Sequence, residues 1–159
     1  MTGPYVAVCG PAAATEEEEG WAEEVGRRLA EAGAVVVCGG LGGVMDAVAR
    51  GAAGAGGTVI GILPGETRAG ASAHLSVAIP TGLGEARNAV VARVADAVIA
   101  IGGEWGTLSE IALARKMGKP VIGLATWELE TAGGTPGAIE RATSPASATA
   151  RAVELAGPA

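Results

Sequence analysis

Thr107 and Glu110 lie three residues apart just after the glycine-rich segment IGGEWGT, at the start of a helical pattern. Residues with that spacing share one face of a helix, so both side chains can reach the same cleft. A carboxylate there can act as a general acid or base, or accept a hydrogen bond from a sugar hydroxyl. Arg87 begins another helical stripe, where its planar guanidinium suits a bidentate contact with an anion. Together these side chains suit a phosphorylated ligand.

Each of these residues also has a simpler role open to it. Arg87 could be a solvated charge, and Glu110 could be an ordinary surface carboxylate. Thr107 could only cap its helix, and Trp105, two residues before it, could be a lid or a packing residue. The sequence does not decide between these roles.

Three glycine-rich segments, CGPAAA, CGGLGGVM and IGGEWGT, each follow an apolar run and precede a helical pattern. Because glycine has no Cβ, backbone N–H groups in such turns can approach a ligand closely, and the helix N-terminus that follows carries about half a positive charge. We expect these turns to bind an anion, above all a phosphate. Tight turns without a ligand are the simpler alternative. The candidate ligand-binding residues in them are Gly10, Gly39, Gly40, Gly42, Gly43, Met45, Gly103, Gly106 and Thr107.

The segment CGGLGGVM also loosely imitates a dinucleotide-binding fingerprint, with Gly40, Gly42 and then Met45 where the third glycine belongs. The match is weak because it follows the second expected strand rather than the first. The nearest candidate for a ribose-binding acid, Glu66, falls in an expected loop. A nicotinamide-dependent enzyme is therefore a minor alternative.

These residues need a scaffold, and short apolar runs alternate with helical patterns along the chain. Fully apolar strands are typical of a parallel sheet covered by helices on both faces, which binds ligands at its carboxyl edge. Thr15 and Glu18 predict a capping box at the start of the first helix. We expect one α/β domain over residues 1–159, with a doubly wound parallel sheet of about six strands. The expected strands are residues 5–9, 34–38, 58–63, 75–79, 97–101 and 120–124; the expected helices are residues 15–32, 44–55, 83–94, 107–117 and 144–156; residues 125–136 are an expected loop.

The composition limits the function. The chain has 159 residues, and its hydrophobic content of 49% is enough for a core. The formal net charge of −6 argues against a nucleic-acid polymer as partner, because its phosphates would be repelled. Cys9 and Cys38 each end an apolar run, which favours buried free thiols over a disulfide or a metal site. The sequence has no signal-peptide pattern and no apolar run long enough for a membrane span, so we expect a cytoplasmic protein without membrane contact.

The spaced motifs between about Val6 and Leu124 resemble the Lonely Guy (LOG) proteins, a Rossmann-like family once labelled "lysine decarboxylase-like". Its phosphoribohydrolases carry a glycine-rich turn ending in Gly-Leu-Met, a helix with Arg-Lys, and the motif Pro-Gly-Gly-x-Gly-Thr-x-x-Glu. Here the corresponding segments are GGLGGVM, Arg87 with Asn88, and GGEWGTLSE. The resemblance implies that Arg87 and Glu110 are the catalytic pair, and it adds Asn88 to the candidate ligand-binding residues.

Three positions depart from the enzyme pattern. Asn88 stands where the enzymes carry Lys, Gly102 replaces the Pro, and Glu104 replaces the second Gly. By contrast, VAVCGPA, TVIGILPG and TGLGEARN are more similar to the branch that contains molybdenum-cofactor carrier proteins, which hold an anionic pterin phosphate. Surplus apolar residues in the helical segments 83–94 and 107–117, like the resemblance, predict a homodimer or a dimer-based oligomer.

Two functions of different classes follow. One is a nucleoside 5′-monophosphate phosphoribohydrolase, which cleaves the N-glycosidic bond to give a base and ribose 5-phosphate and needs no metal or cofactor. The other is a non-catalytic carrier or storage protein for molybdenum cofactor. The bound ligand would accordingly be an AMP-like nucleotide, phosphate or molybdenum cofactor. A lysine decarboxylase is not supported, because the only lysines, Lys116 and Lys119, lie at the far end of their expected helix.

Overall fold

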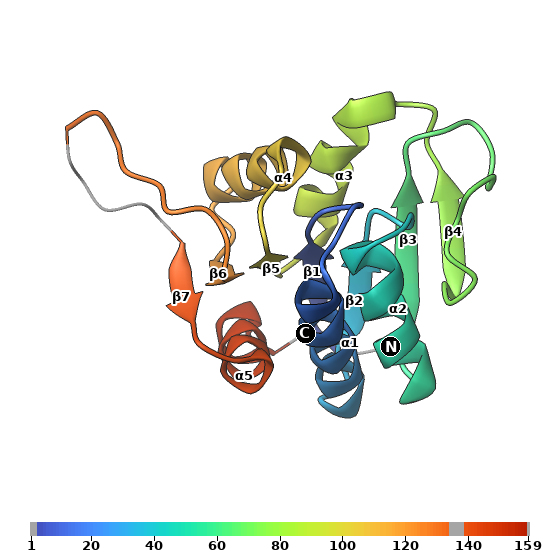
Figure 1. The fold of residues 1–159 in the computed structure, drawn as a ribbon, viewed down its shortest axis with the longest axis horizontal. Helices are drawn as coiled ribbons and strands as arrows, with labels where there is room; N and C mark the ends of the chain where they lie inside the picture. The colour runs from blue at the N-terminus through green and yellow to red at the C-terminus, as the bar shows by residue number, and fades with distance from the viewer. Residues whose placement is uncertain (1–2, 134–138, 159) are drawn as a thin grey trace.

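The computed structural model describes residues 3–133 and 139–158, which form a single α/β domain around one parallel sheet (Figure 1). The central strands are buried apolar segments, because helices cover both faces and leave no solvated side for polar residues. The strand order is β4-β3-β2-β1-β5-β6-β7, and every neighbouring pair is parallel. The strands are β1 (Tyr5–Cys9), β2 (Val35–Cys38), β3 (Val59–Leu63), β4 (Val77–Pro80), β5 (Ala97–Ile101), β6 (Val121–Leu124) and β7 (Glu140–Ala142).

The helices form two layers, one on each face of the sheet (Figure 1). One layer holds α1 (Glu16–Glu31), α2 (Val44–Gly54) and α5 (Pro145–Ala156). The other holds α3 (Arg87–Val94), which follows the short 3₁₀ helix η1 (Gly84–Ala86), and α4 (Trp105–Lys116). Buried apolar side chains accordingly form two clusters, one under each layer. This is the doubly wound arrangement expected from the sequence.

Helix α1 begins where the sequence predicts it, with the expected capping box. The Thr15 hydroxyl accepts a hydrogen bond from the Glu18 backbone N–H at 3.2 Å, and the Glu18 carboxylate accepts one from the Thr15 N–H at 2.8 Å. Four glutamates occupy the first turn, where the helix dipole favours negative charge. Helix α5 begins with a similar box between Ser144 and Ser147.

The order of the strands reverses beside β1. The chain runs outward from β1 through β2, β3 and β4, and then returns to β5 on the other side of β1. Parallel sheets bind their ligands at the carboxyl ends of strands next to such a reversal. The turns after β1, β2 and β5 therefore meet at this edge, and these are the three glycine-rich segments.

The structure differs from the sequence expectations in a few elements. It adds a seventh strand, β7, whose residues Glu140, Arg141 and Ala142 form a largely exposed edge without an apolar run to mark it. Helix α4 begins at Trp105, two residues before its expected start, and the expected helix at 83–94 is divided into η1 and α3. The expected loop at 125–136 extends into residues 134–138, which lie outside the described part of the chain.

The two cysteines lie on opposite faces of the sheet. Cys9 belongs to the apolar cluster under α3 and α4, whereas Cys38 belongs to the cluster under α1, α2 and α5. Both are buried free thiols, as expected, because the sheet between them prevents a disulfide. No helix within the described ranges is both long enough and apolar enough to cross a bilayer.

Candidate functional site

Arg87 places a nearly buried cation at the carboxyl edge of the sheet. It is the first residue of α3 and is only 8% exposed, so it is not the solvated charge that the simpler alternative required. A Cβ on Gly39 would lie 2.0 Å from Arg87 Nη1 and 2.5 Å from the Met45 sulfur. The guanidinium therefore lies against the bare backbone of Gly39, directly after β2, in space that any other residue there would fill.

No hydrogen bond or ion pair reaches the Arg87 guanidinium within the described ranges. Burial of a charge is unfavourable unless an opposite charge or a set of acceptors compensates it. An anion from outside the chain could supply such a counter-charge, so this arrangement makes Arg87 a candidate anion-binding residue.

Glu110 lies on α4 and is 7% exposed, so it is not an ordinary surface carboxylate. Burial raises the pKa of Glu110 from 4.5 to about 7, although the positive charge of Arg87 and a hydrogen bond with Cys9 both lower it. The Glu85 carboxylate raises it slightly further. A carboxyl group with a pKa near neutrality can both release and accept a proton, which is the property of a general acid or base.

The thiols beside this pair are inert. Burial, followed by the charge of Glu110, raises the pKa of Cys9 well above its ordinary value. Burial raises the pKa of Cys38 to about 11, although Arg87 acts in the opposite direction. Neither thiol forms the thiolate that nucleophilic attack requires at neutral pH. Cys9 instead contacts Glu110 from the end of β1.

The turn after β5 leaves polar groups at the start of α4 without a side-chain partner in the described ranges. Its N-cap residue, Glu104, makes no side-chain hydrogen bond to the helix. Thr107 is 2% exposed, and its hydroxyl oxygen has no hydrogen-bond partner in the described structure. Thr107 therefore does not cap the helix, and its buried hydroxyl needs a partner from elsewhere. The N-terminal N–H groups, the helix dipole and this hydroxyl together suit a phosphate.

Some of the candidate glycines are explained by the fold alone. A Cβ on Gly10 would lie 2.6 Å from the Ile101 carbonyl oxygen, and one on Gly43 would lie 2.3 Å from the Pro11 carbonyl oxygen. Gly40 and Gly43 also have φ values of 78° and 61°, which L-residues rarely adopt. The turn-forming alternative therefore accounts for these three glycines, and a direct ligand contact by them stays a prediction.

Gly42 and Gly106 are different, because the protein does not need their small size. Both are exposed; a Cβ on Gly106 would meet no atom within 4 Å, and one on Gly42 would meet only the Ala12 carbonyl oxygen at 3.9 Å. Gly103 is an intermediate case, because a Cβ there would meet a side chain rather than backbone: it would come within 2.9 Å of the Trp127 indole nitrogen. Gly106 is thus an open glycine in the first turn of α4, next to Thr107.

Asn88 connects α3 to α4. Its side-chain amide donates a hydrogen bond to the Ser109 hydroxyl at 2.8 Å, and Ser109 donates one to the Gly106 carbonyl oxygen at 2.7 Å. Asn88 therefore supports the first turn of α4, and its expected contact with the ligand stays a prediction. Sequence reasoning missed Ser109, because no motif marks a serine that bonds to its own helix.

Sequence reasoning also missed Asp46, a carboxylate that makes the N-terminus of α2 less favourable for an anion. Asp46, in the first turn of α2, accepts a hydrogen bond from the Ser72 hydroxyl at 2.6 Å, and Ser72 N–H donates to the Gly40 carbonyl oxygen at 2.8 Å. Asp46 also pairs with Arg50. Its negative charge opposes an anion at the start of α2. The described ranges contain no group of three or more His, Cys, Asp or Glu side chains that could hold a metal ion.

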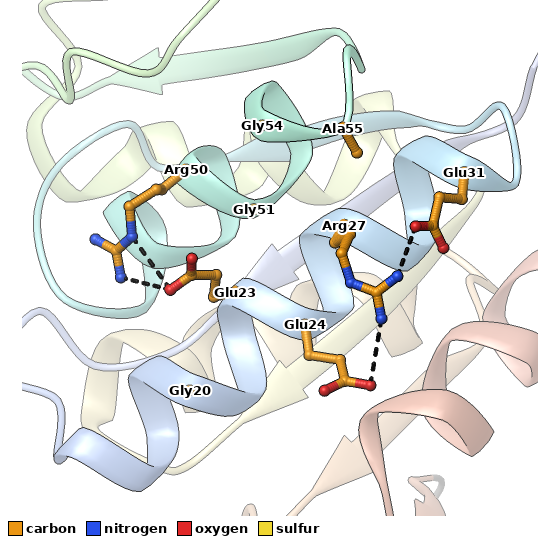
Figure 2. Close-up of a pocket in the computed structure, with 9 residues that line it drawn as sticks. All are labelled: Gly20, Glu23, Glu24, Arg27, Glu31, Arg50, Gly51, Gly54 and Ala55. Atoms are coloured by element: carbon orange, nitrogen blue, oxygen red, sulfur yellow. Dashed lines mark hydrogen bonds and ion pairs between the residues drawn. The ribbon is translucent and has the colours of Figure 1, made fainter.

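A cleft of about 550 Å³ lies between α1 and α2, in the layer opposite to Arg87 and Glu110 (Figure 2). Its charges are paired with one another: Arg50 with Glu23 at 3.0 Å, and Arg27 with Glu31 at 2.5 Å. The pairs are partly exposed and neutralise each other, so the cleft offers no unpaired group to a ligand. It is not the candidate site.

The raised pKa of Glu110 predicts how the stability depends on pH. Because the native pKa of about 7 exceeds the ordinary 4.5, the native protein holds a proton that the unfolded chain releases in this interval. We expect the free energy of unfolding of the parent to fall, relative to that of Glu110→Gln, by about 3 kcal/mol between pH 4.5 and pH 7. Urea unfolding at a series of pH values measures this difference. Glu104→Gln, at an exposed position, is the control, and an equal pH dependence in both variants would contradict the prediction.

Comparison with known proteins places this site in a family. Residues 3–151 match the sequence model of the SLOG cluster4 family. An uncharacterized protein of Archaeoglobus fulgidus is 43% identical over 119 residues, which are 75% of this chain and 78% of that protein. The structure of the molybdenum cofactor binding protein from Rippkaea orientalis is 38% identical, with a TM-score of 0.85 over 92% of this chain and 93% of that one. The molybdenum cofactor carrier protein from Chlamydomonas reinhardtii is 34% identical, with a TM-score of 0.84 over 96% and 98% of the two chains.

These matches agree with the resemblance read from the motifs. The family match contains the three glycine-rich turns together with Arg87, Thr107 and Glu110. The two solved structures confirm the expected branch of the Rossmann-like LOG proteins. The chain belongs to the SLOG cluster4 family.

Proposed function

We propose that this protein binds a small phosphorylated ligand at the carboxyl edge of β1, β2 and β5, and that it serves as a carrier or storage protein for molybdenum cofactor. The observation that carries the proposal is Arg87, a nearly buried cation without a contacting anion. A ligand phosphate supplies the missing counter-charge through a bidentate contact with the guanidinium. Specific binding then depends on the polar groups around that contact.

The groups around Arg87 fit a pterin phosphate. The unpartnered Thr107 hydroxyl and the N–H groups at the start of α4 provide donors, and Gly106 leaves room for the phosphate to approach them. Gly39 keeps the guanidinium against the backbone, in a space that a Cβ would fill. These contacts use the chain's own residues to bind and orient the cargo.

The carrier role is favoured over catalysis by two facts. The structural neighbours from Rippkaea orientalis and Chlamydomonas reinhardtii are a cofactor binding protein and a cofactor carrier protein. In addition, Asn88 replaces the lysine of the enzyme pattern and is used to hold α4 through Ser109. The site therefore has one fewer cation than the pattern of the phosphoribohydrolases.

The second candidate function is hydrolysis of a nucleoside 5′-monophosphate, and the raised pKa of Glu110 favours it. Arg87 would stabilise negative charge on the ligand, and Glu110 would orient water or take its proton during attack at the anomeric carbon. The products would be a free base and ribose 5-phosphate. The same residues serve both functions, so turnover has to distinguish them.

We further propose that the protein forms a homodimer through the layer of α3 and α4. Val77 and Ile79 on β4 are exposed, and their register with Ile60 and Ile62 puts them on the α3 side of the sheet. Leu83, just before η1, is also exposed. An apolar area of this kind on one face suits a symmetric contact with a second copy.

The dimer is expected to depend on this face. Leu83→Glu should give a monomer in light scattering at micromolar concentration, because a charge would be buried in the contact. Leu155→Glu, at another exposed leucine on α5 in the opposite layer, should leave the dimer intact. A monomeric parent, or a Leu83→Glu variant that remains a dimer, would contradict this interface.

Gly106→Ala should separate folding from binding. Because the Cβ meets no protein atom, we expect the free energy of unfolding to rise by about 0.5 kcal/mol. The same Cβ would intrude where the phosphate meets the helix, so we expect affinity for ribose 5-phosphate to fall about tenfold or more. Calorimetric titration and urea unfolding measure the two effects. Gly54→Ala, at the open end of α2, should leave the affinity unchanged; full affinity in Gly106→Ala would place the phosphate elsewhere.

Base release tests the carrier against the enzyme. We expect the parent to release no base from AMP, GMP, CMP or UMP at micromolar protein, and to bind a pterin phosphate. Glu110→Gln should then alter affinity alone. If base release is found, the carrier proposal is wrong; Glu110→Gln should in that case reduce turnover by about 100-fold or more, the usual effect of removing a general acid or base.

A further inference from the structure

Trp105 is an aromatic side chain that the fold leaves in solvent. It is 77% exposed, more than any other large hydrophobic residue that the structure describes as exposed. Tryptophan is on average a largely buried residue, because its ring brings much apolar area out of water. The anion site proposed above makes no use of it.

The exposed ring is nevertheless held in place. The rings of Trp105 and Trp127 are tilted by 37°, with centroids 5.2 Å apart. Trp127 in turn donates a hydrogen bond from its indole nitrogen to the Glu104 carbonyl oxygen at 3.2 Å. Gly103 admits this indole, since a Cβ there would lie 2.9 Å from its nitrogen. The segment after β6 thus fixes the turn before α4 and, with it, the base of Trp105.

Trp105 shares its helix turn with the proposed phosphate site. It is the first residue of α4, so it borders the N-terminal N–H groups that the site would use. Thr107 follows two residues later, but residues with that spacing face different sides of a helix, and Thr107 is buried whereas Trp105 is exposed. The helix N-terminus, and not the Thr107 side chain, therefore connects Trp105 to the phosphate. A ring joined by a short linker to a phosphate on the axis of α4 would extend over this turn, where Gly106 leaves open space.

The surroundings favour a single flat ring over a protein surface as the partner of Trp105. The neighbouring residues Gly103, Glu104 and Gly106 are exposed and carry no apolar side chain. The exposed aliphatic residues are on other elements, namely β4, the segment before η1, and α5. Protein interfaces bury contiguous apolar patches, whereas one rigid indole suits stacking against one aromatic ring.

We propose that Trp105 is the stacking surface for the heteroaromatic ring of the phosphorylated ligand, a pterin or a purine. The proposal rests on the phosphate site described above and assigns the ring end of the ligand. Stacking on an aromatic side chain tolerates any flat heterocycle and typically contributes about tenfold or more in affinity. Trp127 holds the platform in advance, so little conformational freedom is lost on binding.

Three probes with and without a ring test the proposal. GMP and 6-hydroxymethylpterin phosphate both contain a fused 2-amino-4-oxopyrimidine ring, whereas ribose 5-phosphate has no aromatic ring. We expect the parent to bind at least one of the ring-bearing probes about tenfold or more tightly than ribose 5-phosphate. Trp105→Leu should lose this preference and keep its affinity for ribose 5-phosphate, and Trp105→Phe should keep most of the preference. Tryptophan fluorescence should be quenched by the ring-bearing probes and not by ribose 5-phosphate.

The outcomes separate this proposal from the phosphate site. If the parent binds all three probes equally, or if Trp105→Leu keeps the preference for a ring, the stacking role is overturned while the phosphate site stands. If Trp105→Leu weakens all three probes to the same extent, or becomes monomeric with its ring preference intact, Trp105 has a structural or interface role instead. If none of the probes binds the parent, the phosphate site fails and the stacking proposal fails with it.

Discussion

The candidate site depends on an Arg87 guanidinium that is nearly buried and has no contacting carboxylate among the described residues. Such an arrangement is unfavourable by itself, because a cation that leaves water needs compensation. The fold tolerates it by leaving a small opening to solvent and by placing Glu110 near enough to attract the charge without a contact ion pair. A closer Glu110 would neutralise Arg87, and a solvated Arg87 would be available to any anion. The intermediate arrangement leaves the cation nearly buried, near Glu110 but not in an ion pair with it, at the carboxyl edge of the sheet.

The remaining structure keeps this arrangement in place. The strand reversal beside β1 brings the turns after β1, β2 and β5 to one edge, and Gly39 gives the guanidinium a bare backbone to lie against. Asn88 and Ser109 fix the first turn of α4 to α3, so that Arg87 and Thr107 keep their relative positions. A Cβ on Gly42 or Gly106 would meet little or no protein, so a ligand could approach the backbone closely at these two turns. A fold that positions groups in this way can hold a phosphate firmly with few side chains.

The carrier and the enzyme would use the same anion site and would differ in what Glu110 does. With a pKa of about 7, Glu110 can hold a proton and donate a hydrogen bond, or lose it and accept one. A carrier needs only the hydrogen bond, whereas a hydrolase needs the proton transfer timed to bond cleavage. The similarity to a cofactor carrier favours the first role. Trp105 is compatible with both, because a pterin and a purine present similar flat faces to an indole.

The sequence by itself determined the scaffold, because apolar runs, the Thr15 capping box and the glycine turns are local signals that act within a few residues of chain. It also singled out Arg87, Thr107 and Glu110 as candidate site residues through their spacing and family pattern. It missed β7, since a three-residue charged edge strand carries no apolar period. It also could not distinguish the glycines that the turns themselves require, Gly10, Gly40 and Gly43, from Gly39, which lies against Arg87, and Gly106, which faces open space. Only the tertiary structure decided these points, together with the burial of Arg87 and the hydrogen bond from Asn88 to Ser109. They depend on which atoms from distant segments come within a few ångströms, and burial and pKa follow from that proximity rather than from residue type.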